Sequence, residues 1–124
     1  MKRFENLKGV IFFALPVLVA FLIAACAVEP RKSVPEKYKV GQTKFHQICA
    51  NCHGPDAMGG NKAPNLIQEK FTRENFSNGR IAKTILNGSS SGSMPSQKGR
   101  VSEKEIKEII KYLRYSQRTY NDAS

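Results

Sequence analysis

Cysteine and histidine are scarce in this sequence, which has three Cys and two His among 124 residues. Two of the cysteines and one histidine stand together as Cys49-x-x-Cys52-His53. Only Cys26 and His46 remain to supply the fourth ligand of a zinc site, and Cys26 lies far upstream in an apolar run. This scarcity disfavours zinc and makes the five-residue motif the centre of any site chemistry.

Strand patterns are also lacking. A half-buried strand shows strict alternation of apolar and polar residues, and no stretch of the chain does so convincingly. With 124 residues and helical periodicity in its place, the sequence predicts one all-α domain over residues 38–120. A domain this small has a marginal apolar core and gains from a bound group on which its helices can pack.

Three segments carry the helical periodicity. The first covers residues 38–52, and the second opens at Asn75 or Ser77 and stops at Gly88. Gly41 lies inside the first pattern, where glycine costs about 1 kcal/mol relative to alanine. We therefore expect another backbone or ring to approach Gly41 closely. Residues 54–66 are rich in turn formers and predict a loop.

The third helical segment has the best-marked start. Ser102-x-x-Glu105 forms a capping box, and the apolar face that follows consists of Ile106, Ile109, Ile110 and Leu113. The basic residues of this helix are expected to face solvent; they are Lys104, Lys107, Lys111 and Arg114. Residues 116–124 are polar and predict a frayed end.

The first 28 residues have the pattern of an export signal, in which a basic start precedes an apolar run over residues 10–28. The stretch before Cys26 resembles a bacterial lipoprotein signal, in which this cysteine is lipidated and becomes the new N-terminus. Residues 1–25 would then be a signal peptide, and residues 26–37 the lipidated Cys26 and a proline-containing tether. This assignment also explains the odd cysteine.

An uncleaved membrane anchor is the alternative for the same residues, because about 17 to 25 apolar residues suffice to span a bilayer. Both interpretations place the domain on the extracytoplasmic, periplasmic side of a bacterial membrane. Residues 121–124 form a tail.

Acidic residues are half as frequent as basic ones, with 10 Asp and Glu against 20 Lys and Arg and a formal charge of +10. A basic balance is compatible with nucleic acid, anionic lipid or an acidic protein partner. Export argues against nucleic acid. The basic residues are scattered along the chain, so a solvated surface is as good an interpretation as a docking face.

The motif Cys49-x-x-Cys52-His53 predicts covalent haem attachment. On one helical turn, each cysteine can form a thioether with a haem vinyl group, and His53 then reaches the iron as proximal ligand. A thioredoxin-like dithiol also uses Cys-x-x-Cys, but there the motif opens a helix after a strand and does not need His53. Here the preceding residues are helical in pattern, which favours haem.

Met94 is the candidate for the second iron ligand. It is the one large, soft side chain in a polar stretch over residues 89–96, and a thioether is a weak donor suited to haem iron. The alternative is a methionine packed on the core. Met58 lies too near His53 in sequence to reach the opposite haem face. His46 is expected to be a solvent-exposed helix residue and not an iron ligand.

Several motifs in order resemble the class I monohaem c-type cytochromes, close to small bacterial electron carriers. They are Gly41-x-x-x-Phe45-x-x-x-Cys49-Ala50-Asn51-Cys52-His53-Gly54, Ala63-Pro64-Asn65-Leu66, Ile81-x-x-x-Ile85-Leu86-Asn87-Gly88, Met94-Pro95 and the terminal helix with Tyr112. The resemblance implies a small cytochrome c fold, with about three main helices around one covalently attached haem c.

The resemblance also implies residue roles. Cys49 and Cys52 would carry the thioethers, and His53 and Met94 would be the axial ligands. The Pro64 carbonyl would accept a hydrogen bond from the His53 ring. By the same likeness, Gly41 and Phe45 would cross the last helix near Tyr112.

The expected function is that of an extracytoplasmic single-electron carrier, cycling haem iron between Fe(III) and Fe(II) and catalysing no bond chemistry itself. Its partners would be redox proteins, acidic ones if the basic surface takes part. Two alternatives stay open: an open-site haem protein acting as a peroxidase or gas binder, and a cytochrome subunit of a larger oxidoreductase.

Overall fold

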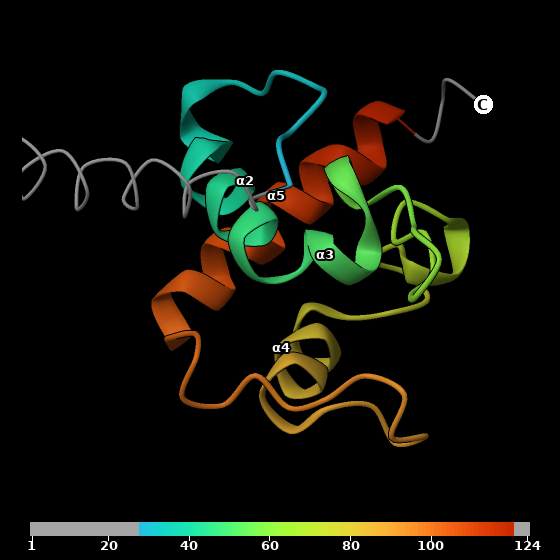
Figure 1. Ribbon diagram of the computed structural model, residues 1–124. Helices are drawn as coiled ribbons and strands as arrows, with labels where there is room; N and C mark the ends of the chain where they lie inside the picture. Colours follow the sequence, from blue (N-terminus) through green and yellow to red (C-terminus); the bar gives the residue numbers. More distant parts are fainter. Residues whose placement is uncertain (1–27, 121–124) are drawn as a thin grey trace, which may run out of the picture.

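The computed structural model describes residues 28–120, and these residues form a helical domain. Its α-helices are α2 (Glu36–Ile48), α3 (Ala50–His53), α4 (Asn78–Asn87) and α5 (Glu103–Tyr120), with short 3-10 turns at Pro55–Ala57 and Glu69–Phe71 (Figure 1). Within the described residues, the only β-type pairing is an isolated bridge between Lys98 and Val101. The predicted all-α fold class is confirmed.

The frame of the domain is the crossing of α2 with α5, which Figure 1 shows in its upper half. A Cβ added at Gly41 would lie 2.1 Å from the Glu108 carbonyl oxygen and 2.8 Å from Tyr112 Cβ. Next to this contact, the rings of Phe45 and Tyr112 are 5.5 Å apart and both are buried. The close approach expected at Gly41 and the crossing near Tyr112 are therefore confirmed.

Helix ends follow the local chemistry of the sequence. The Ser77 hydroxyl accepts a hydrogen bond from the Arg80 N–H at the start of α4, and Gly88, with φ of +83°, ends that helix. The predicted capping box is present, because Ser102 Oγ accepts from Glu105 N–H at 3.3 Å and Ser102 N–H donates to Glu105 Oε2 at 2.8 Å.

The first predicted helix, over residues 38–52, is two helices in the structure. Its first part, α2, starts at Glu36 and stops at Ile48, and α3 begins again at Ala50. Cys49 stands between them with φ of −105° and ψ of −34°. Cys49 therefore lies at the junction of the two helices, and Cys52 and His53 lie on α3.

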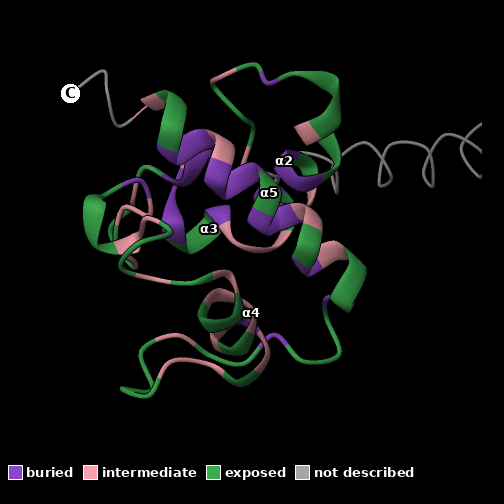
Figure 2. Cartoon of the chain, turned by 180° about the vertical axis from the view of Figure 1, so that it is seen from behind, coloured by how far each residue is buried: buried purple, intermediate pink, exposed green. Residues whose placement is uncertain are grey.

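Two predictions for α5 are wrong. Arg114 is only 6% exposed and does not face solvent. The end of the helix is not frayed, because α5 continues to Tyr120 with Ser116 and Gln117 buried. Figure 2 shows buried segments along much of α5.

The reason is the irregular chain that packs on the second half of α5. Arg114 donates to the Phe71 carbonyl at 2.8 Å, to the Phe76 carbonyl and to Asn78 Oδ1 at 2.8 Å. Gln117 Nε2 donates to the carbonyls of Leu66 and Phe71, both at 2.9 Å. A segment without regular structure leaves carbonyl groups unpaired, and these two side chains satisfy them.

Part of the segment expected to be a tether is packed against the domain. Val34 is buried, Arg31 N–H donates to Asp56 Oδ2 at 3.0 Å, and Gln42 Nε2 donates to the Lys32 carbonyl at 2.7 Å. The predictions for residues 1–25, for Cys26 and for residues 121–124 lie outside the described residues. None of the helices within residues 28–120 is long and apolar enough to cross a membrane.

Candidate cofactor site

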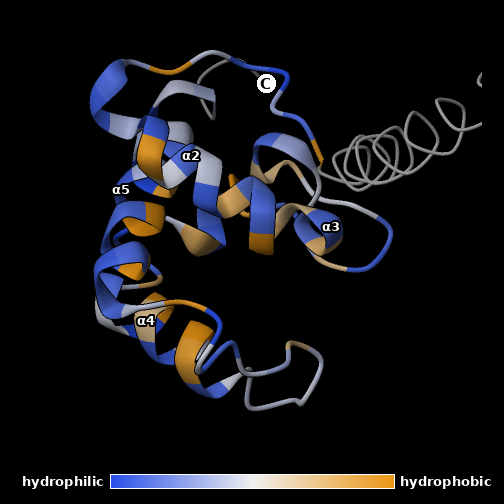
Figure 3. Ribbon diagram, turned by 60° about the vertical axis from the view of Figure 1, so that its left-hand side comes forward, coloured by the Kyte–Doolittle hydropathy of each residue, from blue (hydrophilic) through white to orange (hydrophobic). Residues whose placement is uncertain are grey.

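A largely apolar, partly open cavity of about 960 Å³ lies between the helices and the long loops. Its walls come from α2, the Cys49–His53 turn, residues 62–66, α4, residues 88–97 and α5. The apolar lining includes Phe45, Ile48, Leu66, Phe71, Phe76, Ile81, Ile85, Ile109 and Leu113. Figure 3 shows hydrophobic segments along α4 and α5, the two helices that supply several of these residues. The cavity brings together all five residues predicted for the site from sequence: Cys49, Cys52, His53, Pro64 and Met94.

The attachment motif forms one tight turn at the cavity wall. The Cys49 carbonyl accepts from Cys52 N–H at 3.1 Å and from His53 N–H at 2.9 Å. Gly54, with φ of +74°, ends the turn, and a Cβ there would lie 1.9 Å from the Gly59 carbonyl oxygen. The turn thus presents two unbridged thiols and one imidazole to the same space.

The state of the thiols argues against the dithiol alternative. Burial, together with a smaller effect of the neighbouring Cys52, raises the pKa of the Cys49 thiol to about 12. Redox-active dithiols need a lowered thiol pKa, because the thiolate is the attacking species. Cys49 has the opposite environment, which suits a thiol consumed in a bond.

The ring of His53 is oriented by the backbone. His53 Nδ1 donates to the Pro64 carbonyl at 3.0 Å, and a carbonyl only accepts, so the ring proton lies on Nδ1. Nε2 then keeps its lone pair for a metal, as in other sites where a second hydrogen bond fixes the ligand histidine. This is the hydrogen bond that the resemblance implied.

The two methionines of the described chain differ in position. Met94 is partly buried against the core and lines the cavity. Met58 is 40% exposed, and it is not among the described residues that line the cavity. The prediction that Met94, and not Met58, faces the site agrees with this placement.

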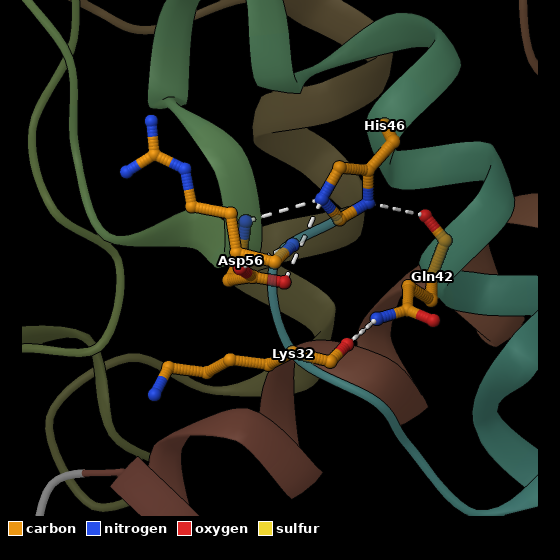
Figure 4. Close-up of polar contacts among 5 residues, drawn as sticks. Lys32, Gln42, His46 and Asp56 are labelled. Carbon is orange, nitrogen blue, oxygen red and sulfur yellow. Dashed lines mark hydrogen bonds and ion pairs between the residues drawn. The ribbon is translucent and has the colours of Figure 1, made fainter. Parts of the chain in front are cut away.

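His46 was predicted to be exposed, and this is wrong. It is 6% exposed, its Nδ1 donates to the Gln42 carbonyl at 2.8 Å, and its Nε2 accepts from Asp56 N–H at 3.1 Å (Figure 4). Asp56 Oδ1 lies 3.7 Å from the same nitrogen. His46 is absent from the described lining of the cavity, so its role is to support the chain behind the attachment turn.

This support is needed because the backbone after the turn is strained. Asp56 and Ala57 have φ of +57° and +63°, a region that costs a non-glycine residue about 1–2 kcal/mol. The hydrogen bonds of Asp56 to His46 and Arg31 hold it there. The helical periodicity of the sequence does not predict these contacts between His46, Asp56 and Arg31. The one local sign is that Gln42 and His46 lie one helical turn apart.

The chemistry of the cavity fits a haem. It combines an extensive apolar lining with two thiols, an imidazole with a free ring nitrogen and a thioether. The fold and the site together define a monohaem c-type cytochrome.

Comparison with protein families agrees with this assignment. Residues 36–113 match the family model described as cytochrome C oxidase, cbb3-type, subunit III. The match covers more than half of the chain, and the protein belongs to this family of haem-binding, electron-transfer cytochromes. The matched segment contains all five candidate site residues, the whole of α2 and the part of α5 up to residue 113.

Proposed function

We propose that the protein is an extracytoplasmic, membrane-anchored carrier of single electrons with one covalent haem c. The observation that carries the proposal is the convergence of Cys49, Cys52, His53 and Met94 on one apolar cavity. When bound, the haem supplies an iron that cycles between Fe(III) and Fe(II). The protein would therefore act as a carrier and not as an enzyme.

The residues of the chain have distinct roles in this proposal. Cys49 and Cys52 would hold the macrocycle by thioethers, and His53, whose Nδ1 proton is donated to the Pro64 carbonyl, would offer Nε2 to the iron. Met94, from the loop after α4, would supply a sulfur ligand, and the iron would then have no open position for substrate. The apolar side chains of α4 and α5 exclude water and so limit charge reorganisation around the site.

A second candidate is a cytochrome subunit of an oxidase complex. The family description, which names an oxidase subunit, is the observation that favours it. Affinity purification from the native membrane, followed by haem staining, tests the two: a stable stoichiometric oxidase partner supports the subunit, and an isolated haem protein supports the free carrier.

Basic side chains at the cavity suggest the chemistry of a redox partner. Lys62 and Lys83 line the cavity, and Lys98 and Arg100 are exposed further along the chain. We propose that they contact an acidic partner protein. Electron transfer to this partner should then slow as the salt concentration rises, because exposed charges are screened within about 10 Å at 0.1 M. Rates independent of salt would mean that these residues contact solvent and not the partner.

The proposed anchor rests on the sequence alone. If Cys26 is lipidated, wild-type protein should lack residues 1–25 and carry added lipid mass, and Cys26→Ala should accumulate as the precursor. Intact mass spectrometry of the membrane fraction measures both. Residues 1–25 still present in wild type would support the uncleaved helix.

The central experiment tests Met94 as iron ligand, with Met58 as the matched control. Oxidised wild type should show the weak near-infrared sulfur-to-iron band, and reduced wild type should bind carbon monoxide slowly. Met94→Ala should abolish the band, lower the potential and admit carbon monoxide, whereas Met58→Ala should change none of these. Rapid carbon monoxide binding by wild type would reject the carrier in favour of an open-site haem protein.

Covalent attachment is tested separately by extraction with acidified acetone. Haem should remain with wild-type protein and be lost from a variant in which Cys49 and Cys52 are both serine. Free extraction of haem from wild type would refute the attachment.

A further inference from the structure

The segment that presents Met94 returns to the end of α4 and is joined there to Ser89. Ser89 N–H donates to the Met94 carbonyl at 3.0 Å, and Met94 N–H donates to Ser89 Oγ at 2.9 Å. Both polar groups of the Met94 backbone are thus bound by one residue. Ser89 is itself half-buried and lines the same cavity as Met94.

We propose that Ser89 is a positioning residue for Met94, which holds the methionine backbone so that its sulfur stays at the cavity. This inference rests on the proposed role of Met94 as iron ligand. The backbone hydrogen bond from Ser89 N–H would survive many substitutions, but the bond to Oγ depends on a hydroxyl at this position. The side chain is therefore the part that a mutation can test.

The neighbouring serines give the Ser89 hydroxyl further hydrogen-bond partners. The Oγ atoms of Ser89, Ser91 and Ser93 are within hydrogen-bond distance of one another, at 2.8 to 3.3 Å. A hydroxyl can accept and donate at the same time, so Ser89 Oγ can accept from Met94 N–H while it donates its own proton to Ser91 or Ser93. One lone pair of Ser89 Oγ thus accepts from Met94 N–H. The serine-rich sequence has a structural role here, because its hydroxyl groups are hydrogen-bond partners of the residue that contacts Met94.

The rest of the loop is fastened at a different place. Gln97 N–H donates to the Ile85 carbonyl at 2.8 Å, and the Ser96 hydroxyl donates to the Leu86 carbonyl. These contacts hold the chain after Met94 and do not involve Met94 itself. Among the hydrogen bonds of the described residues, the Ser89 hydroxyl provides the one side-chain contact to the methionine backbone.

Loss of the Ser89 hydroxyl should loosen the ligand without unfolding the domain. A partly buried N–H left without an acceptor favours conformations in which water reaches it, and for one such bond the population changes about tenfold. These conformations would draw the sulfur away from the iron. The expected result is a higher population of the ligand-off state, visible in the same spectra that report Met94.

The experiment uses full-length, haem-loaded protein in four forms: wild type, Ser89→Ala, Ser89→Thr and Ser33→Ala. Ser33 is the control for loss of a serine hydroxyl, because it is exposed, is not among the described residues that line the cavity and forms no side-chain hydrogen bond to any described residue. The measurements are the carbon monoxide binding rate of the reduced protein and the intensity of the near-infrared band of the oxidised protein. Far-ultraviolet circular dichroism checks that all four forms keep their helices.

Ser89→Ala should bind carbon monoxide about tenfold faster than wild type and show a weaker band. Ser89→Thr, which keeps the hydroxyl, should stay close to wild type, and Ser33→Ala should match wild type. The inference is overturned if Ser89→Ala behaves like Ser33→Ala, or if Ser89→Thr binds carbon monoxide as fast as Ser89→Ala. A helix content that falls in Ser89→Ala would make Ser89 a structural brace and also count against the inference.

Met94→Ala, measured alongside, separates this inference from the proposed function. If Met94→Ala abolishes the band while Ser89→Ala leaves it unchanged, Met94 is the ligand and only the role of Ser89 fails. If Met94→Ala leaves the band intact, the proposed ligand itself is wrong.

Discussion

Gly41→Ala should destabilise the domain, because the backbone of α5 already occupies the space that the new methyl group needs. The added Cβ would lie 2.1 Å from the Glu108 carbonyl oxygen, where ordinary contacts begin at 3.4 Å. A shortfall of about 1.3 Å at a backbone atom cannot be relieved by a side-chain rotation. The two helices would have to move apart, which would also loosen the packing of Phe45 on Tyr112.

The magnitude follows from two opposing effects. Overpacking of a tight contact costs about 1–3 kcal/mol, and a clash with backbone belongs at the upper end of that range. Replacing glycine by alanine inside a helix returns about 1 kcal/mol. The free energy of unfolding should therefore fall by about 2 kcal/mol, and the melting temperature by about 10 °C.

The assay is thermal and guanidinium unfolding of the haem-loaded protein, followed by circular dichroism. Gly79→Ala is the matched control, since Gly79 lies in the first turn of α4 and a Cβ there meets nothing within 4 Å. The control should be more stable than wild type by about 0.4–1 kcal/mol. If Gly41→Ala is as stable as Gly79→Ala, the close crossing of α2 and α5 is refuted.

Two further predictions concern α5. Arg114→Ala should lower the free energy of unfolding by about 2–4 kcal/mol, because it leaves the Phe76 carbonyl and Asn78 Oδ1 without their donor. Arg118→Ala, at an exposed position of the same helix, should change the free energy of unfolding little in the same denaturation assay. Equal effects of the two substitutions would contradict the buried network. The hydrogen bonds from Lys44 and Ser102 lower the pKa of Glu105 to about 2 from its ordinary value of 4.5. The stability contributed by ionised Glu105 is therefore complete above about pH 4.5 and is lost as pH falls towards 2. Between about pH 4.5 and 2, Glu105→Gln should lose less stability than wild type. Parallel curves of stability against pH for the two proteins would show that the Lys44–Glu105 ion pair does not contribute to stability.

Much of the candidate site could be predicted from the sequence, because its parts are local. Cys49, Cys52 and His53 fall on one turn by spacing alone, and the capping box at Ser102 forms between residues three apart. Gly41 pointed to a close contact because glycine is otherwise unfavourable inside a helix. Such signals depend on a few neighbouring residues and hold whatever the rest of the chain does.

The tertiary structure decided which polar side chains are buried. Arg114 lies on the polar side of the α5 periodicity, yet an irregular segment far earlier in the chain covers it and uses its donors. His46 is buried in the same way by the strained turn at Asp56, and Ser89 meets Met94 only when the loop folds back on α4. The periodicity of a helix marks its apolar face, but it does not say whether the other face meets water or an unpaired backbone. That choice belongs to segments without regular structure, whose unpaired carbonyl and N–H groups must find partners wherever the fold places them.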